Sequence, residues 1–279
     1  MTRQETVEYL VHKAQVLRND VVEMIGVGPV GHLGGSCSIA DITAALYFHK
    51  MKVDPQDLHN PDRDRYLLSK GHAALIQYAA LAEKGFFARE HLYTVKTLGA
   101  MLQGHPDMTK TPGVEANTGS LGQGLSVANG MALGMRLSKS KGRVYVVIGD
   151  GEVAEGQIWE AAMAASNFKI DNVTAILDRN RLQATGTIEE RFNTSPLKEK
   201  WEAFGWNVII IDGHDMEQIL DALEAAEAVK GRPTIIIANT VKGKGVSFAE
   251  NKVAFHNSAL TQEQYDTAKS DLAKCGGCQ

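Results

Sequence analysis

The second half of the chain alternates short apolar runs with helical patterns, and this alternation limits the possible folds more than any other feature of the sequence. Four runs read as buried strands: 143–148, 173–177, 206–211 and 234–238. Three helical patterns lie between them: 154–168, 195–204 and 215–229. Strands that alternate with helices pair in parallel through right-handed crossovers. We therefore predict an α/β fold with a doubly wound, mostly parallel sheet and helices on both faces.

The first half of the chain carries fewer signals. Apolar residues at three- and four-residue spacing predict a helix over 7–24, followed by a Gly/Ser loop. A second helical pattern begins at Ser38, and 65–68 is a candidate strand. A last helix is predicted over 261–275. No linker or internal repeat divides the chain, so residues 1–279 are predicted to form one domain.

Charge and composition exclude several classes of protein. Lys and Arg number 29 against 33 Asp and Glu, a net charge of −4 that provides no basic surface for nucleic acid or anionic lipid. The two longest uncharged stretches, 24–40 and 116–135, are interrupted by small and polar residues, so neither resembles a membrane span. Three cysteines make a poor disulfide framework, and the first residues lack an apolar signal core. We expect a cytoplasmic protein.

Glycine is frequent where ligand contacts are expected. The chain has 27 Gly against 7 Pro, and the glycines cluster at 26–35, 119–134, 149–156 and 243–245. Glycine lets the backbone approach a ligand closely or turn sharply. In parallel sheets, ligands bind beyond the carboxyl ends of the strands. The candidate site therefore lies in the loops after Ile148, Leu177, Ile211 and Ala238.

One of these loops has the composition of a metal-bridged phosphate site. Gly149, Asp150 and Gly151 follow the strand that ends at Ile148 and lead into the next helix. Free backbone, a helix N-terminus and a carboxylate suit a phosphate held by a hard cation. Alone, these residues read as a surface turn. Asn180 follows the next strand, however, so Asp150 and Asn180 are expected to project from adjacent strand ends toward one Mg²⁺ or Ca²⁺.

Two other motifs resemble functional sites but are not interpreted as such. Residues 26–31 satisfy a dinucleotide-binding fingerprint letter for letter, but they follow a helix rather than a strand and contain Pro29. Cys275 and Cys278 supply at most two metal ligands and lack the strand–helix setting of a redox motif, so we interpret them as thiols at a frayed terminus.

Six ordered motifs resemble the N-terminal half of transketolase, a family that binds thiamine diphosphate. They are Gly31–Gly35, Leu68–Ala73, Gly104–Pro106, Thr118–Gly124, Gly149–Gly156 with Asn180, and Lys242–Gly245 with His256. The motifs occur in family order and span positions 31–256, which is nearly the whole chain. The resemblance implies a thiamine diphosphate-binding fold and a single diphosphate-binding domain.

The resemblance also implies a cofactor site. Asp150, the Asn180 side chain and the Leu182 carbonyl would hold the divalent cation, which is Mg²⁺ or, in its place, Ca²⁺ or Mn²⁺. The residues implied to bind thiamine diphosphate are His72, Gly119, Leu121, Gly122, Gly151, Glu152, Asn180, Lys244 and His256.

Catalytic residues are implied in the same way. His32 and His105 would contact the carbonyl and hydroxyl oxygens of the sugar, and His256 would lie near the reacting carbons. Glu155 and Glu160 fall where the family has acidic residues that communicate between paired active sites. Imidazoles suit reversible proton transfer to alkoxides, while the cofactor acts as electron sink. The remaining histidines are assigned to structure or solvent: His12, His49, His59, His91 and His214.

A partner chain is a further implication. Single-chain transketolases continue into a second α/β domain that binds the aminopyrimidine of the cofactor, and this sequence ends before such a domain. We expect the N-terminal subunit of a split transketolase, which transfers a two-carbon ketol unit from a ketose to an aldose. Its partner would be a complementary C-terminal subunit, in a heterotetramer of two of each. Two alternatives remain: the α subunit of a thiamine diphosphate-dependent 2-oxo acid dehydrogenase, and a non-catalytic cofactor-binding module.

Three positions depart from the common single-chain pattern. Leu33 follows His32 where Pro is frequent, Ser120 replaces another Pro, and Ala184–Gly186 stands where an aliphatic-Asp-Gly sequence is common. These departures leave the cofactor assignment intact. They leave the sugar open, either an ordinary pentose phosphate or a specialised sugar, sulfonated or branched.

Overall fold

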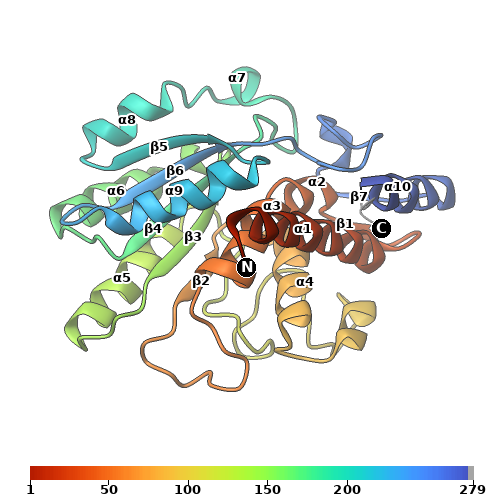
Figure 1. Cartoon of the computed structure of the whole chain (residues 1–279). Helices are drawn as coiled ribbons and strands as arrows, with labels where there is room; N and C mark the ends of the chain where they lie inside the picture. Colours follow the sequence, from red (N-terminus) through yellow and green to blue (C-terminus); the bar gives the residue numbers. More distant parts are fainter. Residues whose placement is uncertain (276–279) are drawn as a thin grey trace.

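Five parallel strands form the central sheet, in the spatial order β2-β3-β4-β6-β5 (Figure 1). Their bounds are β2 Arg65–Leu68, β3 Val144–Gly149, β4 Val173–Arg179, β5 Asn207–Asp212 and β6 Thr234–Asn239. The sheet belongs to a computed structural model that describes residues 1–275. The strands predicted from the sequence are confirmed, with bounds that differ by one or two residues.

Helices cover both faces of the sheet, because successive residues of a strand point to opposite sides and both sides are apolar here. Tyr145 and Val147 pack with one group of helices, and Val144, Val146 and Ile148 pack with the other. The first group is α1 (Arg3–Ile25), α3 (Ala40–Ala45), α4 (Ala74–Lys84) and α9 (Met216–Ala228). The second is α5 (Gly124–Leu137), α6 (Gly156–Asn167) and α8 (Leu197–Ala203). The doubly wound α/β prediction is confirmed.

Several short elements complete the chain. They are α2 (Leu33–Cys37), α7 (Ile188–Arg191), α10 (Gln262–Cys275), the π-helical η1 (Leu46–Lys50), and the 3₁₀ turns η2 (Gly71–Ala73), η3 (Arg89–Thr94), η4 (Glu152–Ala154) and η5 (Val253–Phe255). β1 (Val30–Gly31) pairs antiparallel with β7 (Ser258–Ala259). The predicted Gly/Ser loop after α1 is thus wrong, because β1 and α2 occupy it. The helices α4 and α5 were not predicted. Helix α4 is buried on nearly all sides and shows no polar face, so it lacks the pattern of a surface helix.

The sheet register brings the candidate site residues together. β3 lies beside β4, and Gly149 pairs with Asp178 across the two strands. The predicted adjacency of the strand ends that precede Asp150 and Asn180 is therefore confirmed. Residues 26–31 close α1 and enter β1, which is not the strand–turn–helix setting of a dinucleotide fingerprint.

The remaining expectations concern membranes and the terminus. Within residues 1–275, no helix combines the length and the apolar character that a bilayer crossing requires. Cys278 lies outside the described residues.

An aromatic cluster under the sheet gives the first prediction. Trp206 is 1% exposed, and its indole Nε1 donates to the Ala162 carbonyl at 3.0 Å. Its ring packs edge-on against Trp201, with ring centroids 5.0 Å apart. We expect Trp206→Ala to lower the free energy of unfolding by about 3–5 kcal/mol, because it removes a large buried side chain. Urea denaturation measures this change. Trp206→Phe is the matched control with a smaller expected loss, and a loss below about 1 kcal/mol for Trp206→Ala would contradict the packing argument.

Candidate active site

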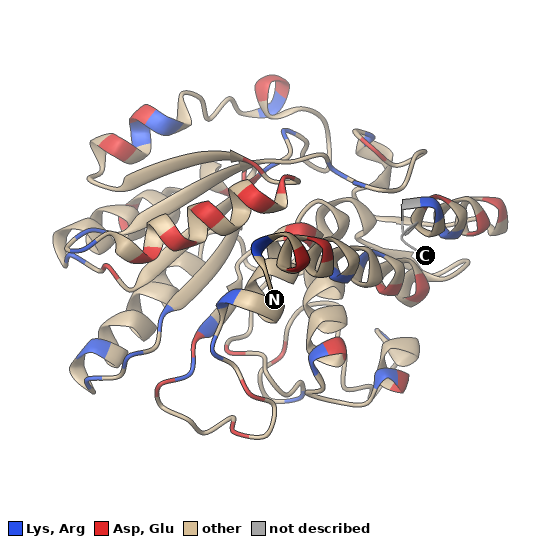
Figure 2. Cartoon of the chain, viewed as in Figure 1, with Lys and Arg blue, Asp and Glu red and all other residues tan. Residues whose placement is uncertain are grey.

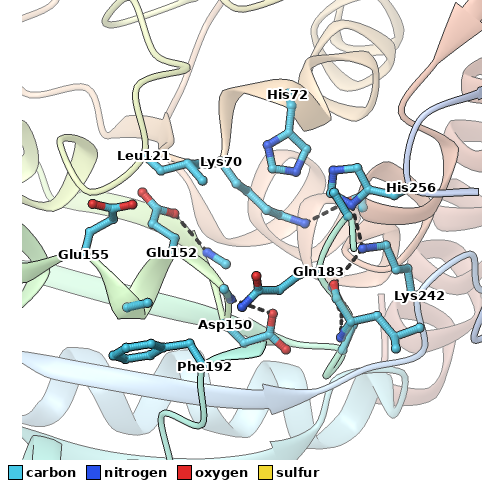
Figure 3. Close-up of a pocket in the computed structure, with 17 residues that line it drawn as sticks. Lys70, His72, Leu121, Asp150, Glu152, Glu155, Gln183, Phe192, Lys242 and His256 are labelled. Carbon is cyan, nitrogen blue, oxygen red and sulfur yellow. Dashed lines mark hydrogen bonds between the residues drawn. The ribbon is translucent and has the colours of Figure 1, made fainter. Parts of the chain in front are cut away.

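A cavity of about 420 Å³ opens at the carboxyl edge of the sheet. Loops that follow four strands supply its polar lining: Lys70 after β2, Asp150 after β3, Asn180 after β4 and Lys242 after β6. Figure 3 shows the basic and imidazole side chains along one side of the cavity and the two glutamates on the opposite side. This is the edge at which parallel sheets bind ligands.

Asp150 is a buried carboxylate that lacks a cationic partner within hydrogen-bond reach in the described chain. It is 4% exposed and accepts hydrogen bonds from the backbone N–H groups of Gly151, at 2.8 Å, and Arg181. Burial, followed by the charge of Asp178, raises the pKa of Asp150 to about 7. A cation bound here would offset the cost of burying this charge.

The other two predicted metal ligands lie in the same wall of the cavity. Asn180 is 8% exposed, and its Oδ1 accepts from the Leu182 N–H at 3.1 Å. The Leu182 carbonyl accepts from Lys242 Nζ at 2.7 Å. Asn180 and Leu182 thus stand beside Asp150 in the cavity lining, as the sequence predicted, while their role as metal ligands stays a prediction.

Asp178 fixes the orientation of Asn180. It is 0% exposed, and its Oδ2 accepts from Lys70 Nζ at 2.6 Å, Ser38 Oγ at 2.7 Å and Asn180 Nδ2 at 2.8 Å. Its Oδ1 accepts from Thr240 Oγ1. Burial alone would raise the pKa of Asp178, but Lys70 and the hydrogen bonds lower it. Asp178 is therefore a satisfied carboxylate that holds its neighbours in place.

Three predicted histidines form a cluster, and two of them, His72 and His256, line the cavity. The ring centroids of His32, His72 and His256 lie 5.1 to 5.5 Å apart. Burial and nearby cations lower the pKa of His32 to about 4, of His72 to about 2 and of His256 to about 3. Among the described residues, Nδ1 of His32 is buried without a hydrogen-bond partner. All three rings are neutral at physiological pH.

His105 lies on the long connection before α5, and after burial and Lys96 it also lowers the pKa of His32. It is exposed, and a Cβ placed on Gly119 would come within 2.8 Å of the His105 ring. Gly119 has φ of 144°, which also favours glycine. Burial and Lys96 lower the pKa of His105.

The lysine assignment from the sequence needs a correction. Lys244, predicted to bind the diphosphate, has a side chain that is 40% exposed with Nζ 4.0 Å from Glu250, and it does not line the cavity. Lys242, two positions earlier, is 2% exposed and donates to His256 Nδ1 at 2.8 Å as well as to Leu182. Burial, and then Lys70, lowers the pKa of Lys242 to about 8. The cavity lysine of this loop is Lys242.

The predicted glutamates occupy different environments. Glu152 lines the cavity, but its oxygens accept from Ser69 Oγ, the Gly122 N–H at 2.9 Å and the Gly149 N–H at 3.0 Å. It therefore ties the Gly122 loop to the end of β3. Glu155 is exposed at the cavity rim beside Leu121, whereas Glu160 is exposed on α6 outside the lining.

The cavity residues that the sequence reasoning missed include Lys70, Gln183, Phe192 and Lys242, and it also missed the fully buried Asp178 that accepts from Lys70. Lys70 and Asp178 stand at or just after strand ends, and Lys242 follows three positions after β6. A systematic reading of every strand end would have found them. No sequence signal points to Gln183 or Phe192.

These residues fit a diphosphate held through a divalent cation. Gly151 leaves open backbone at the cavity, and a Cβ there would come within 3.0 Å of Gln183. Lys242 supplies positive charge, and Asp150 supplies a carboxylate that has no cationic partner within residues 1–275. Over residues 1–275, no group of three His, Cys, Asp or Glu side chains is arranged to hold a metal. One carboxylate with an amide and a carbonyl suits Mg²⁺, which takes further ligands from phosphate and water.

Comparisons with known proteins identify the family of this chain. The family model "Transketolase, thiamine diphosphate binding domain" matches residues 7–274. A 6-deoxy-6-sulfo-D-fructose transketolase subunit of Clostridium sp. (strain MSTE9) is 48% identical over 96% of this chain and 97% of that protein. Human transketolase is 42% identical over 92% of this chain but only 41% of its own length. The chain belongs to the transketolase thiamine diphosphate-binding domain family.

The solved structures extend the agreement to the fold. Transketolase from Campylobacter jejuni superposes with a TM-score of 0.88 at 31% identity, over 98% of this chain. The matched part is 43% of that enzyme's chain, so this chain spans less than half of the solved transketolases that it matches. The similarity supports the transketolase interpretation and not the α subunit of a 2-oxo acid dehydrogenase.

The two lysines of the 242–245 loop can be tested against each other. We expect Lys242→Met to weaken the binding of magnesium pyrophosphate to the purified chain about tenfold or more, because a buried charge-assisted contact is lost. Lys244→Met is the matched control and should bind as the unaltered chain does. Titration calorimetry measures both, and equal losses in the two variants would refute the assignment.

Proposed function

We propose that this chain is the diphosphate-binding subunit of a thiamine diphosphate-dependent transketolase. It would transfer a two-carbon ketol unit from a ketose to an aldose. The observation that carries the proposal is the group of charged and imidazole side chains at the carboxyl edge of the sheet. There the unpaired carboxylate of Asp150 and the ammonium of Lys242 lie beside three neutral imidazoles, in a chain that matches transketolase subunits over nearly their whole length.

The cofactor would be held by the residues of the strand ends. Asp150, Asn180 and the Leu182 carbonyl would bind Mg²⁺, and Lys242 and the Gly151 backbone would contact the diphosphate. When bound, thiamine diphosphate supplies the nucleophilic carbon and the electron sink for carbon–carbon bond cleavage. The protein's remaining task is to orient the sugar and to move protons.

The histidines would perform the proton transfers. An ammonium only donates, so His256 Nδ1 accepts from Lys242 and the proton of the neutral ring resides on Nε2. His256 is therefore fixed as an Nε2–H donor toward a sugar oxygen. His32 and His105 would bind the hydroxyl and carbonyl oxygens, since the neutral form of each ring, favoured by the lowered pKa, can both donate and accept.

The sugar is proposed to carry an anionic group. Burial lowers the pKa of both His32 and His105, and the positive charge of Lys96 lowers it further, so Lys96 lies within electrostatic reach of the two histidines proposed to bind the sugar. Similar subunits are named for 6-deoxy-6-sulfo-D-fructose and, in Phocaeicola vulgatus at 41% identity, for apulose-4-phosphate. Both names describe sugars with a terminal anion. A phosphorylated or sulfonated ketose is the class that we propose.

A complementary subunit is proposed to complete the active site. The two subunit relatives are covered over 97% and 95% of their lengths, whereas the matched part of human transketolase is 41%. A second chain that binds the aminopyrimidine would supply the remainder. Such a complex would act in the cytoplasm.

Two copies of this chain are proposed to meet through the outer face of α5 and α6. Exposed apolar or small residues there are Val127, Gly130, Gly134 and Met163, and the exposed Glu160 lies one turn before Met163 on α6. A Cβ on Gly130 or Gly134 would meet nothing within 4 Å, and Figure 2 shows basic residues only near the C-terminal end of α5. A face with small and apolar residues allows close helix approach and supports a heterotetramer of two of each subunit.

Reconstitution tests the activity. We expect the purified chain to show no transketolase turnover alone, and to gain turnover when mixed with a complementary pyrimidine-binding subunit, thiamine diphosphate and Mg²⁺. Ketose consumption measured by coupled assay checks this, with a phosphorylated and a sulfonated ketose as donors.

Controls separate the competing interpretations. Asp150→Ala in the same mixture should be inactive and should lose metal-dependent cofactor binding by calorimetry. Full activity of the chain alone would refute the two-subunit proposal. Decarboxylation of a 2-oxo acid without ketol transfer would refute the transketolase proposal itself.

The assembly has its own test. Met163 is 51% exposed at the α5–α6 face, so Met163→Asp should halve the mass of the complex measured by light scattering, because it buries an unpaired charge between two copies. Val11→Asp on α1, where Val11 is 39% exposed, is the matched control and should leave the mass unchanged. An unchanged mass for Met163→Asp would exclude this face as the interface.

A further inference from the structure

We propose that His214 is a positioning residue that sets the place of Lys242 in the cavity. The inference rests on the proposed function, because Lys242 matters through the diphosphate. His214 was assigned to structure or solvent from the sequence, yet it lies in the loop after β5, and the cavity lining comes from the loops after the other four strands. The structure connects it to Lys242 through a series of buried and partly buried hydrogen bonds.

The first contact in this series is an ion pair between α1 and α3. Arg18 is 6% exposed and Asp41 is 5% exposed. Arg18 Nη1 donates to Asp41 Oδ1 at 3.2 Å, and Nη2 donates to Oδ2. Burial alone would raise the pKa of Asp41, but Arg18 and His214 lower it to about 2. Asp41 is thus a permanently charged acceptor locked between two helices.

His214 links the Asp41 carboxylate to the loop that follows β6. Its Nδ1 lies 2.8 Å from Asp41 Oδ2, and its Nε2 accepts from the backbone N–H of Val241 at 2.8 Å. An N–H needs an acceptor, so Nε2 carries no proton and Nδ1–H is the donor to Asp41. The two partners therefore specify one neutral tautomer and one orientation of the ring.

Val241 immediately precedes Lys242, so the orientation of His214 is transmitted to the lysine. Two other contacts hold the same loop: the Gly243 N–H donates to the Gly34 carbonyl at 3.0 Å, and the Asn251 N–H donates to the Lys242 carbonyl at 2.9 Å. The His214 contact is the one at the residue directly before Lys242; one residue earlier, the Thr240 N–H donates to the Arg179 carbonyl at 3.2 Å and its hydroxyl donates to Asp178. Losing it would leave the Val241 N–H without its acceptor and allow the lysine to shift away from Leu182 and His256.

Two substitutions separate the halves of the His214 contact. Asn places an amide near the position of Nδ1, which keeps a donor for Asp41 and removes the acceptor for Val241. Gln reaches the position of Nε2 and can present its Oε1 to Val241. We expect His214→Asn to weaken magnesium pyrophosphate binding to the purified full chain about tenfold, as partners that orient a ligand typically do. His214→Gln should recover most of this loss. Titration calorimetry measures both, with His59→Asn in an exposed turn as the control that leaves affinity unchanged.

A double-variant cycle tests whether the effect passes through Lys242. In a Lys242→Met background, His214→Asn should change the affinity less than twofold, because the residue that it positions is gone. A merely structural role would lower the affinity in both backgrounds. Equal affinities of the His214→Asn variant and the unaltered chain, or equal losses for Asn and Gln, would overturn the proposal.

Hydrogen exchange on the unaltered chain tests the contact without any variant. The Val241 amide should exchange slowly, as a buried hydrogen-bonded amide does. Rapid exchange of this amide would overturn the inference even if His214→Asn does not fold. Failure of the unaltered chain to bind magnesium pyrophosphate or magnesium thiamine diphosphate would instead contradict the proposed function.

Discussion

One buried carboxylate organises the carboxyl edge of the sheet. Asp178 accepts hydrogen bonds from Lys70 after β2, Asn180 after β4, Thr240 after β6 and Ser38 after α2. A fully buried charge is tolerated only when its partners are complete, so these four segments cannot move independently. The loops of the cavity are therefore held by a satisfied interior ion pair, and the residues that face the cavity are left to bind ligand.

The same burial determines the chemistry of the histidines. His32, His72 and His256 lie among Lys70, Lys96 and Lys242, and low solvent access prevents a further positive charge from forming there. Neutral imidazoles can both donate and accept, which an imidazolium cannot. Burial and the neighbouring lysines thus keep these histidines neutral, and the neutral rings act as oriented hydrogen-bonding groups.

The sequence predicted the sheet and the proximity of Asp150 and Asn180 well because both depend on local patterns. Continuous apolar runs marked the strands, and glycines around Asp150 marked the strand end. The lysine was misassigned because Lys242 and Lys244 both follow β6 within a Gly-rich loop, and only the three-dimensional path of that loop shows which one is buried. The role of Glu152 as a brace between Gly122 and Gly149 depends on contacts between distant segments, which spacing does not reveal. Helix α4 was missed because burial on all sides removes the periodicity that marks a surface helix.

The charges of the cavity suggest why cation and diphosphate would bind as a pair. Lys70 is neutralised by Asp178, which leaves Asp150 and Lys242 as opposed charges in the loops after β3 and β6, while Glu152 and Glu155 lie on the opposite side of the cavity (Figure 3). A divalent cation alone would gain Asp150 but meet the ammonium of Lys242 near the Leu182 carbonyl. A diphosphate alone would gain Lys242 but meet the carboxylate of Asp150. Each ion removes the repulsion that opposes the other, so their affinities are coupled, and thermodynamic linkage makes that coupling reciprocal.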